Sequence, residues 1–270
     1  MSPADRWRVQ LEAWRIPDDL LAAVEESPYG WPQRFWKRRS AVAVDAPEPH
    51  TLQVVRNLLD DRGSVLDVGA GRGRASLPLA REGHHLTAVE RDPGMAAGLV
   101  ADAADLGVEV HLFELPWPEA AASVPRADVV MSAHVVYDVP DIVPFLTAMI
   151  DHAAEAVVIE LSERHPWAGL APYYRALHGL ERPDGPTAED FAAVVSDIVG
   201  HPPHVETWTR QGGLYFEDWD ELREMFGRRL VLPRRRWAEL DDLLDVTEVD
   251  GRLYVGGEVR ELVTVWWRAP

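Results

Sequence analysis

The chain has 270 residues, of which 27 are Lys or Arg and 45 are Asp or Glu, so its formal net charge at pH 7 is −18. A chain with this charge is repelled by phosphate backbones, which argues against nucleic acid as a partner. It has no Cys, which excludes disulfides, thiolate metal sites and cysteine nucleophiles, and no apolar run near the roughly 20 residues that a membrane helix needs.

The first 60 residues are predicted to be helical. Apolar residues recur at helical spacing over residues 5–26. Two further helices are expected over 32–40 and 48–60. The aromatic residues of this segment, among them Trp31 and Trp36, are expected either to line a lid or to anchor the segment to the rest of the fold.

From residue 64 onward, short apolar runs alternate with helical stretches. Strands are expected at 65–66, 86–89, 108–113, 127–131 and 156–161, with helices at 74–81, 93–104, 118–122 and 140–152. Strands that begin about every 20 to 30 residues, with helices between them, predict a parallel sheet that is covered by helices on both faces.

After residue 162 the pattern becomes irregular. Helices are expected at 173–180, 187–199, 218–229 and 234–244, and strands at 204–209, 253–255 and 261–267. No linker marks a second globular unit. The predicted organisation is therefore a helical extension over residues 1–60, followed by one α/β domain over residues 61–270.

The most informative segment runs Val-Leu-Asp-Val-Gly-Ala-Gly-Arg-Gly-Arg over residues 65–74. An apolar strand enters a glycine-rich turn, and a helix follows, which brings backbone N–H groups close to a ligand. A dinucleotide fingerprint needs a glycine where this chain has Arg74, and a P-loop needs a Lys-Ser/Thr pair that is missing. An acidic residue followed by G-x-G-x-G resembles the first motif of class I S-adenosylmethionine-dependent methyltransferases.

The resemblance implies a doubly wound, Rossmann-like sheet of seven strands in the order 3-2-1-4-5-7-6. It also implies S-adenosylmethionine as cofactor and S-adenosylhomocysteine as product. Asp67 would lie near the methionine ammonium group, and Glu90, at the end of the second strand, would accept hydrogen bonds from the ribose hydroxyls. The complete set of expected cofactor contacts is Asp67, Gly69, Ala70, Gly71, Gly73, Glu90, Arg91, Glu114, Leu115, Trp117, Ser132 and Ala133.

The whole chain also resembles a group of uncharacterised bacterial methyltransferases with an aromatic N-terminal extension. In this chain, His134 and Tyr137 follow the fourth predicted strand and are the candidates for a base or a substrate contact. The candidates for the substrate pocket are Trp31, Trp36, His165, Trp167, Tyr174 and His178. No set of residues has the spacing of a metal site.

The predicted function is methyl transfer to an oxygen or nitrogen atom of a small molecule, in the cytoplasm and without a membrane partner. Two alternatives remain open at this point. One is a methyltransferase-like module that binds the cofactor or a partner without catalysis, and the other is a nicotinamide-dependent oxidoreductase. Neither the acceptor nor the oligomeric state follows from the sequence.

Overall fold

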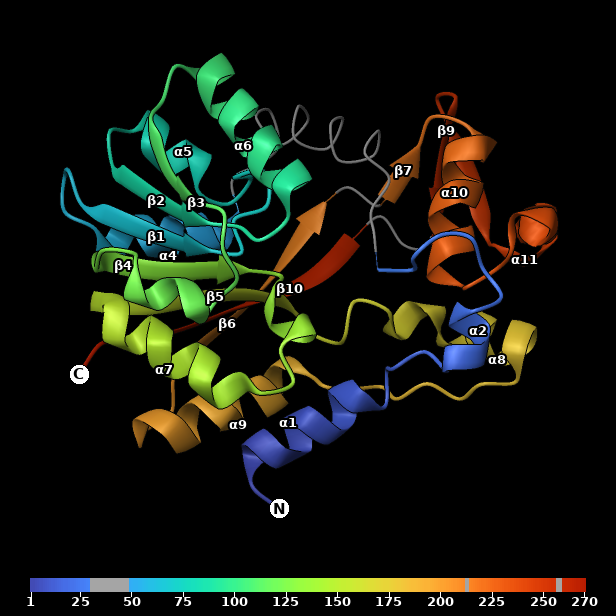
Figure 1. The fold of residues 1–270 in the computed structure, drawn as a ribbon, viewed down its shortest axis with the longest axis horizontal. Helices are drawn as coiled ribbons and strands as arrows, with labels where there is room; N and C mark the ends of the chain where they lie inside the picture. Colours follow the sequence, from blue (N-terminus) through green and yellow to red (C-terminus); the bar gives the residue numbers. More distant parts are fainter. Residues whose placement is uncertain (30–48, 212–213, 256–258) are drawn as a thin grey trace.

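The computed structural model describes residues 1–29, 49–211, 214–255 and 259–270 (Figure 1). The predicted helix at 32–40 lies outside these ranges, and so do Trp31 and Trp36. In the described part of the chain, no helix is both long enough and apolar enough to cross a membrane.

A seven-stranded sheet forms the centre of the molecule, in the order β3-β2-β1-β4-β5-β10-β6. The first five strands are parallel, and β10 runs antiparallel to both of its neighbours. This confirms the predicted order, with β10 in the place of the seventh strand. The strands are β1 (Ser64–Val68), β2 (His85–Val89), β3 (Val110–Phe113), β4 (Ala127–Ala133), β5 (Ala153–Ser162), β6 (His204–Gln211) and β10 (Val259–Arg268).

Helices cover both faces of the sheet because successive side chains of each buried strand point to opposite sides. On one face, Val65 and Val158 pack with α4 (His50–Leu58), α5 (Leu77–Arg81) and α6 (Pro93–Leu106). On the other face, Leu66 and Val157 pack with α7 (Ile142–His152), α9 (Ala188–Val199) and α1 (Pro3–Glu12). Figure 1 shows α1, α7 and α9 together along this second face.

A second lobe, which the sequence did not predict, has its own core and lies beyond the carboxyl ends of the parallel strands (Figure 1). Its small sheet has the order β7-β9-β8, so the strand expected near residue 253 does not join the main sheet. The elements of this lobe are β7 (Leu214–Phe216), β8 (Val246–Val249), β9 (Arg252–Val255), α2 (Asp18–Leu21), α8 (Ala171–His178), α10 (Trp219–Arg229) and α11 (Leu240–Leu243), together with the 3₁₀ turns η3 (Ala168–Leu170) and η4 (Arg234–Glu239).

The single helix predicted over residues 5–26 is wrong, because α1 ends at Glu12 and α2 begins only at Asp18. Pro17, which stands before α2, cannot continue a helix. In the connection, Ile16 is fully buried, and the indole of Trp14 donates a hydrogen bond of 2.6 Å to the carbonyl of Gly185. These tertiary contacts outweigh the helical spacing of the apolar residues.

We expect Trp7→Phe to lower the free energy of unfolding by about 2 kcal/mol, because it leaves a carbonyl unpaired and reduces packing in the core. Trp7 has no exposed surface, and its Nε1 donates a hydrogen bond of 3.0 Å to the carbonyl of Val139. Its ring packs 5.5 Å from that of Phe191. Urea denaturation measures the change, and Val9→Ala on the exposed side of the same helix is the control. Equal stability of the two variants would contradict this role of Trp7.

Candidate functional site

The glycine-rich turn after β1 has the conformation that its sequence predicts. Gly69, Gly71 and Gly73 all have positive φ values, of 72°, 58° and 78°. A Cβ on Gly69 would lie 2.5 Å from a methyl group of Val135, whereas a Cβ on Gly71 would meet nothing within 4 Å. Gly69 therefore permits close packing, and Gly71 lies beside open space where a ligand can approach the backbone.

Asp67 lies at the end of β1, and only 1% of its surface is exposed. Both of its carboxylate oxygens are buried without a hydrogen-bond partner in the described part of the protein. Burial raises the pKa of Asp67 to about 6. Because a buried polar group without a partner is costly, this carboxylate fits a site for a cationic ligand group.

Glu90 follows β2 and is oriented by two backbone groups. One of its oxygens accepts a hydrogen bond of 2.8 Å from the N–H of Gly71, and the other accepts one of 2.8 Å from the N–H of Asp92. The carboxylate therefore lies directly beside the glycine-rich turn. Each oxygen keeps a further acceptor position, so the pair can bind two adjacent hydroxyl groups. Arg91 is exposed next to it.

The predicted adenine contacts after β3 lie in two different environments. Glu114 and Leu115 are exposed, and 40% of the Leu115 surface is accessible. Trp117 donates a hydrogen bond of 3.1 Å from Nε1 to the carbonyl of Phe145 on α7, and its ring meets that of His152 edge-on. The ring of Trp117 thus has a packing role, and its contact with a ligand stays a prediction.

At the end of β4, the chain turns sharply at His134, whose φ is 61°. The side chain of Ser132 points back into the fold and donates a hydrogen bond of 2.7 Å to the carbonyl of Val68, while Ala133 is half-buried beside it. Nε2 of His134 lies 3.1 Å from Oε1 of Glu160, and the side chain of His134 is 35% exposed. The ring is thus anchored on one side and accessible on the other.

Glu160 on β5 connects His134 to Arg74. Its carboxylate is 1% exposed, and its Oε1 accepts a hydrogen bond of 2.9 Å from Nη2 of Arg74. Burial opposes ionisation of Glu160, but Arg74 and His134 hold its pKa well below the usual range. Burial lowers the pKa of His134 from 6.5, although Glu160 opposes this shift. At neutral pH, therefore, His134 is uncharged next to an ionised carboxylate.

The tautomer of His134 follows from this contact. A neutral ring that lies against a carboxylate donates its proton there, from Nε2. Nδ1 then holds a lone pair, and it has no hydrogen-bond partner among the residues that the structure describes. This arrangement allows His134 to accept a proton from a bound molecule.

Tyr137 forms a link between β4 and β5. Its hydroxyl lies 2.8 Å from Oγ of Ser162 and also pairs with the backbone of that residue. Burial raises the pKa of Tyr137 far above 10. The phenol therefore stays protonated and positions the strand ends around the site, and its contact with substrate stays a prediction.

Two of the predicted pocket residues lie where the N-terminal segment meets the loop after β5. His165 stacks on Trp14 with ring centroids 4.2 Å apart, and burial lowers its pKa to about 3. Trp167 stacks against Tyr29, and the guanidinium of Arg229 lies 5.1 Å from the Trp167 ring centroid. Because its pKa is lowered, His165 is neutral at pH 7. The rings of His165 and Trp167 form part of the boundary between the lobes.

Tyr174 and His178 lie inside the second lobe. Tyr174 is fully buried, and its hydroxyl donates to the carbonyl of Arg229. Nε2 of His178 donates a hydrogen bond of 2.6 Å to the carbonyl of Leu230. Both side chains hold α8 against the end of α10, so the structure gives them a packing role, and their contact with substrate stays a prediction.

The sequence prediction did not include Glu160 or Arg74 in the site. Glu160 does carry a signal, because it is an acidic residue within the apolar run 156–161, and a buried acid needs a partner. Its two partners, Arg74 and His134, come from other elements and cannot be identified from spacing.

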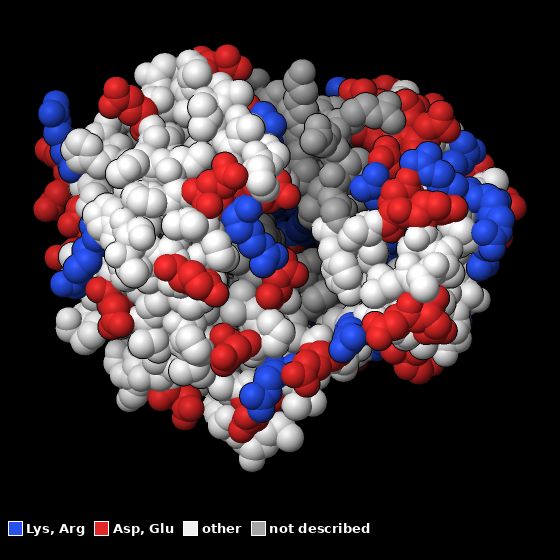
Figure 2. Space-filling model, viewed as in Figure 1, with Lys and Arg blue, Asp and Glu red and all other residues white. Residues whose placement is uncertain are grey.

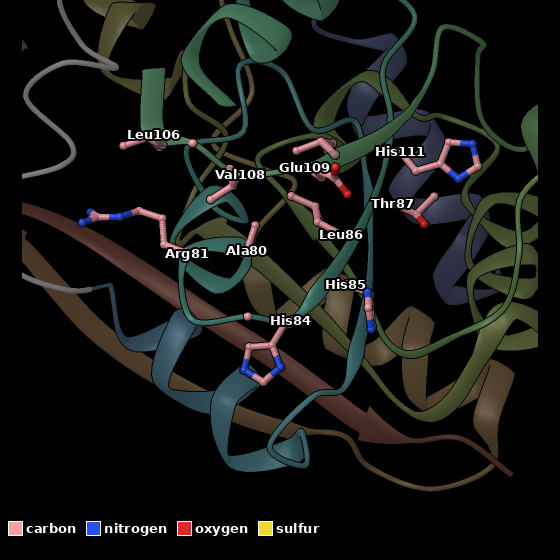
Figure 3. A pocket seen from close by; sticks show the side chains of 13 residues that line it. Ala80, Arg81, His84, His85, Leu86, Thr87, Leu106, Val108, Glu109 and His111 are labelled. Atoms are coloured by element: carbon pink, nitrogen blue, oxygen red, sulfur yellow. The ribbon is translucent and has the colours of Figure 1, made fainter. Parts of the chain in front are cut away.

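The surface is hollowed between the two lobes, and Arg atoms are visible at the edge of this hollow (Figure 2). A separate pocket of about 930 Å³ lies where β2 and β3 begin, between the ends of α5 and α6 (Figure 3). This pocket lies at the ends where the parallel strands begin, whereas the glycine-rich turn follows the carboxyl end of β1. The pocket is therefore distinct from the site around Asp67. The described residues contain no cluster of His, Asp or Glu that could hold a metal ion.

A family model described as a methyltransferase domain matches residues 37–196. No curated protein matches the chain significantly. Many solved structures share its fold at low identity, and three of them are given below. The chain is 13% identical to BH2331 of Bacillus halodurans, provisionally assigned as a methyltransferase, with a TM-score of 0.53 over 82% of this chain and 99% of that one.

The second similar structure is a TehB-like SAM-dependent methyltransferase from Corynebacterium glutamicum. It is 15% identical, with a TM-score of 0.50 over 88% of this chain and 97% of that one. The third comes from echinomycin biosynthesis, where a disulfide bond is converted into a thioacetal group. It is 15% identical, with a TM-score of 0.52 over 84% of this chain and 83% of that one.

Proposed function

The chain belongs to the class I S-adenosylmethionine-dependent methyltransferases, and from this premise we propose that it transfers a methyl group to an oxygen or nitrogen atom of a small molecule. The observation that supports the proposal best is Asp67, a buried carboxylate without a partner next to the open space at Gly71. The net charge of −18 argues against nucleic acid as the acceptor.

The residues around the glycine-rich turn fit the cofactor of this family. Asp67 would bind the ammonium group of its methionine part, and the two oxygens of Glu90 would bind the ribose hydroxyls. Gly71 leaves room for the cofactor to approach the backbone. When bound, S-adenosylmethionine supplies a methyl group on a cationic sulfur, which is a good leaving group. The protein therefore has to align the acceptor and exclude water.

His134 is the proposed general base. It lies after β4 at the same edge of the sheet as Asp67, and its Nδ1 is free to accept the proton that an O–H or N–H acceptor loses on methylation. Glu160 fixes the ring through Nε2 and stabilises the positive charge that the ring gains. Arg74 keeps Glu160 ionised, so that it does not take up this proton.

We further propose that residues 1–60 form an extension that helps to close the site, and that residues 61–270 form the methyltransferase domain. In support, Trp14 stacks on His165, and Tyr29 stacks on Trp167. Arg229 of the second lobe also donates to the carbonyl of Pro28. The two ring contacts join the extension to the loop after β5, where a ligand would bind, and the hydrogen bond joins it to the second lobe.

Calorimetric titration with S-adenosylhomocysteine and with NAD tests the proposal. We expect S-adenosylhomocysteine to bind in the micromolar range and NAD not to bind. Tight binding of NAD alone would favour an oxidoreductase instead. Methyl transfer from labelled S-adenosylmethionine to a panel of small hydroxy and amino compounds then tests catalysis. Cofactor binding without transfer to any compound of the panel would favour a module that does not catalyse the reaction.

A further inference from the structure

Two arginines lie directly opposite each other at the edge of the sheet that faces the second lobe. Arg260 on β10 is the register partner of Arg210 on β6. On the other side of β10, Leu262 pairs with Ser162, the last residue of β5, so the two arginines extend beyond the end of β5. The alternation of side chains places Arg260 and Arg210 on the same face of the sheet as Glu160.

A third arginine approaches this pair from the glycine-rich turn. Arg74 donates from Nη2 to Glu160, but its Nη1 is buried without a hydrogen-bond partner in the described residues. Burial is the largest cause that lowers the pKa of Arg210 and of Arg260. The positive charge of Arg74 is the second cause for each. The three guanidinium groups are therefore close enough to repel one another.

Among the described residues, one carboxylate acts electrostatically on Arg210 and none on Arg260. Arg210 and Arg260 form no ion pair or hydrogen bond through their side chains within the described ranges. Among the described residues, Glu160 is the carboxylate that acts on Arg210, and it is already bonded to Arg74 and His134. Within the described part of the chain, Arg74 therefore interacts with two carboxylates, Glu160 and Asp67, whereas Arg210 is influenced by Glu160 alone and Arg260 by neither.

Like charges directly opposite each other in neighbouring strands destabilise a sheet. A bound anion removes this repulsion and also satisfies Nη1 of Arg74. Guanidinium groups match the geometry of carboxylate and phosphate oxygens, and burial strengthens such contacts. The arrangement therefore has the features of an anion-binding site.

We propose that Arg210, Arg260 and Nη1 of Arg74 bind the carboxylate or phosphate group of the methyl acceptor. That the anionic molecule is the methyl acceptor rests on the proposed function, whereas the anion site rests on the arginines alone. The position of the site supports this assignment, because Arg74 shares Glu160 with His134, and Arg260 acts electrostatically on His134. An anionic group held here places the rest of the molecule near the proposed base.

Titration of the full-length protein with inorganic phosphate and with acetate, at constant ionic strength, tests the site. We expect wild-type protein to bind at least one of them and Arg210→Gln or Arg260→Gln to weaken this binding at least tenfold, because each removes charge-assisted hydrogen bonds. Arg268→Gln is the matched control, since it is on the same strand but pairs with Glu155 near the other end. Preference for phosphate or for acetate identifies the class of anion.

Thermal unfolding separates loss of binding from loss of fold. Without added anion, Arg210→Gln is expected to raise the Tm by roughly 1–3 °C, because it removes the repulsion across the strands. Phosphate or acetate should raise the Tm of the wild-type protein and of Arg268→Gln, but not that of Arg210→Gln or Arg260→Gln. Equal anion binding in all variants, or no anion binding by the wild type, would overturn the proposal.

A second titration, with S-adenosylhomocysteine already bound, assigns the site to acceptor or cofactor. We expect the anion affinity to be unchanged, since an acceptor site must be free when the cofactor is bound. Competition between the two ligands would show that the arginines bind the cofactor carboxylate, and the proposal would be wrong. If the wild type binds the anion but not S-adenosylhomocysteine, the anion site stands and the proposed function fails.

Discussion

Asp67→Asn is expected to weaken the binding of S-adenosylhomocysteine at least about tenfold, because it removes the charge-assisted hydrogen bond that we propose to the ammonium group. Neither oxygen of this carboxylate has a hydrogen-bond partner within the described protein, so both are available to a ligand. Calorimetry at pH 8 measures the loss. Asp105→Asn, at an exposed position on α6, is the control. Unchanged affinity in a folded Asp67→Asn protein would remove Asp67 from the site.

The same substitution is expected to stabilise the ligand-free protein above pH 6. Burial raises the pKa of Asp67 from 3.8 to about 6, so the folded state binds more protons than the unfolded state between these values. The stability of the wild type should therefore fall as the pH rises through this window, by up to about 3 kcal/mol. Because asparagine does not titrate, Asp67→Asn loses this pH dependence. Urea denaturation at pH 4 and pH 8 measures both effects.

His134→Asn is expected to lower kcat at least about 100-fold for an O–H or N–H acceptor, because it removes the proposed general base. Asparagine tolerates the positive φ of 61° at this position, so the backbone should be preserved. The affinity for S-adenosylhomocysteine should stay within about threefold of the wild type, since the cofactor contacts come from other residues. An unchanged kcat would show that His134 is not the base.

The pH profile gives a second test of His134. Its pKa lies below 6.5, so the neutral, active form predominates above pH 7, and kcat should be flat there. It should fall only on the acid side, as the ring becomes protonated. His85→Asn, at the exposed start of β2, should leave both kcat and the profile unchanged. A wild-type profile that still rises between pH 7 and pH 9 would point to a base with a higher pKa.

Local pattern and fixed spacing account for the parts of the site that the sequence predicted. The glycine-rich turn, with Asp67 before it and Glu90 at the end of the next strand, belongs to one β-α-β unit, in which neighbouring strands determine where each residue lies. The alternation of strands and helices predicted a parallel sheet covered by helices, and the resemblance to class I methyltransferases implied the order of its strands. These features depend on contacts that are close in sequence or imposed by the handedness of the fold.

Only the tertiary structure determined the rest. Arg74, His134 and Glu160 come from three separate elements, and Arg210 meets Arg260 because of the register between β6 and β10. The break before Pro17 and the core of the second lobe likewise depend on partners far along the chain. The spacing of residues in a sequence predicts helices, strands and turns, but it does not give the register between two distant strands. A change of register by one residue alters which side chains face each other. The sequence therefore determined the fold and the cofactor, and the packing of distant strands determined the groups of the proposed base and of the proposed anion site.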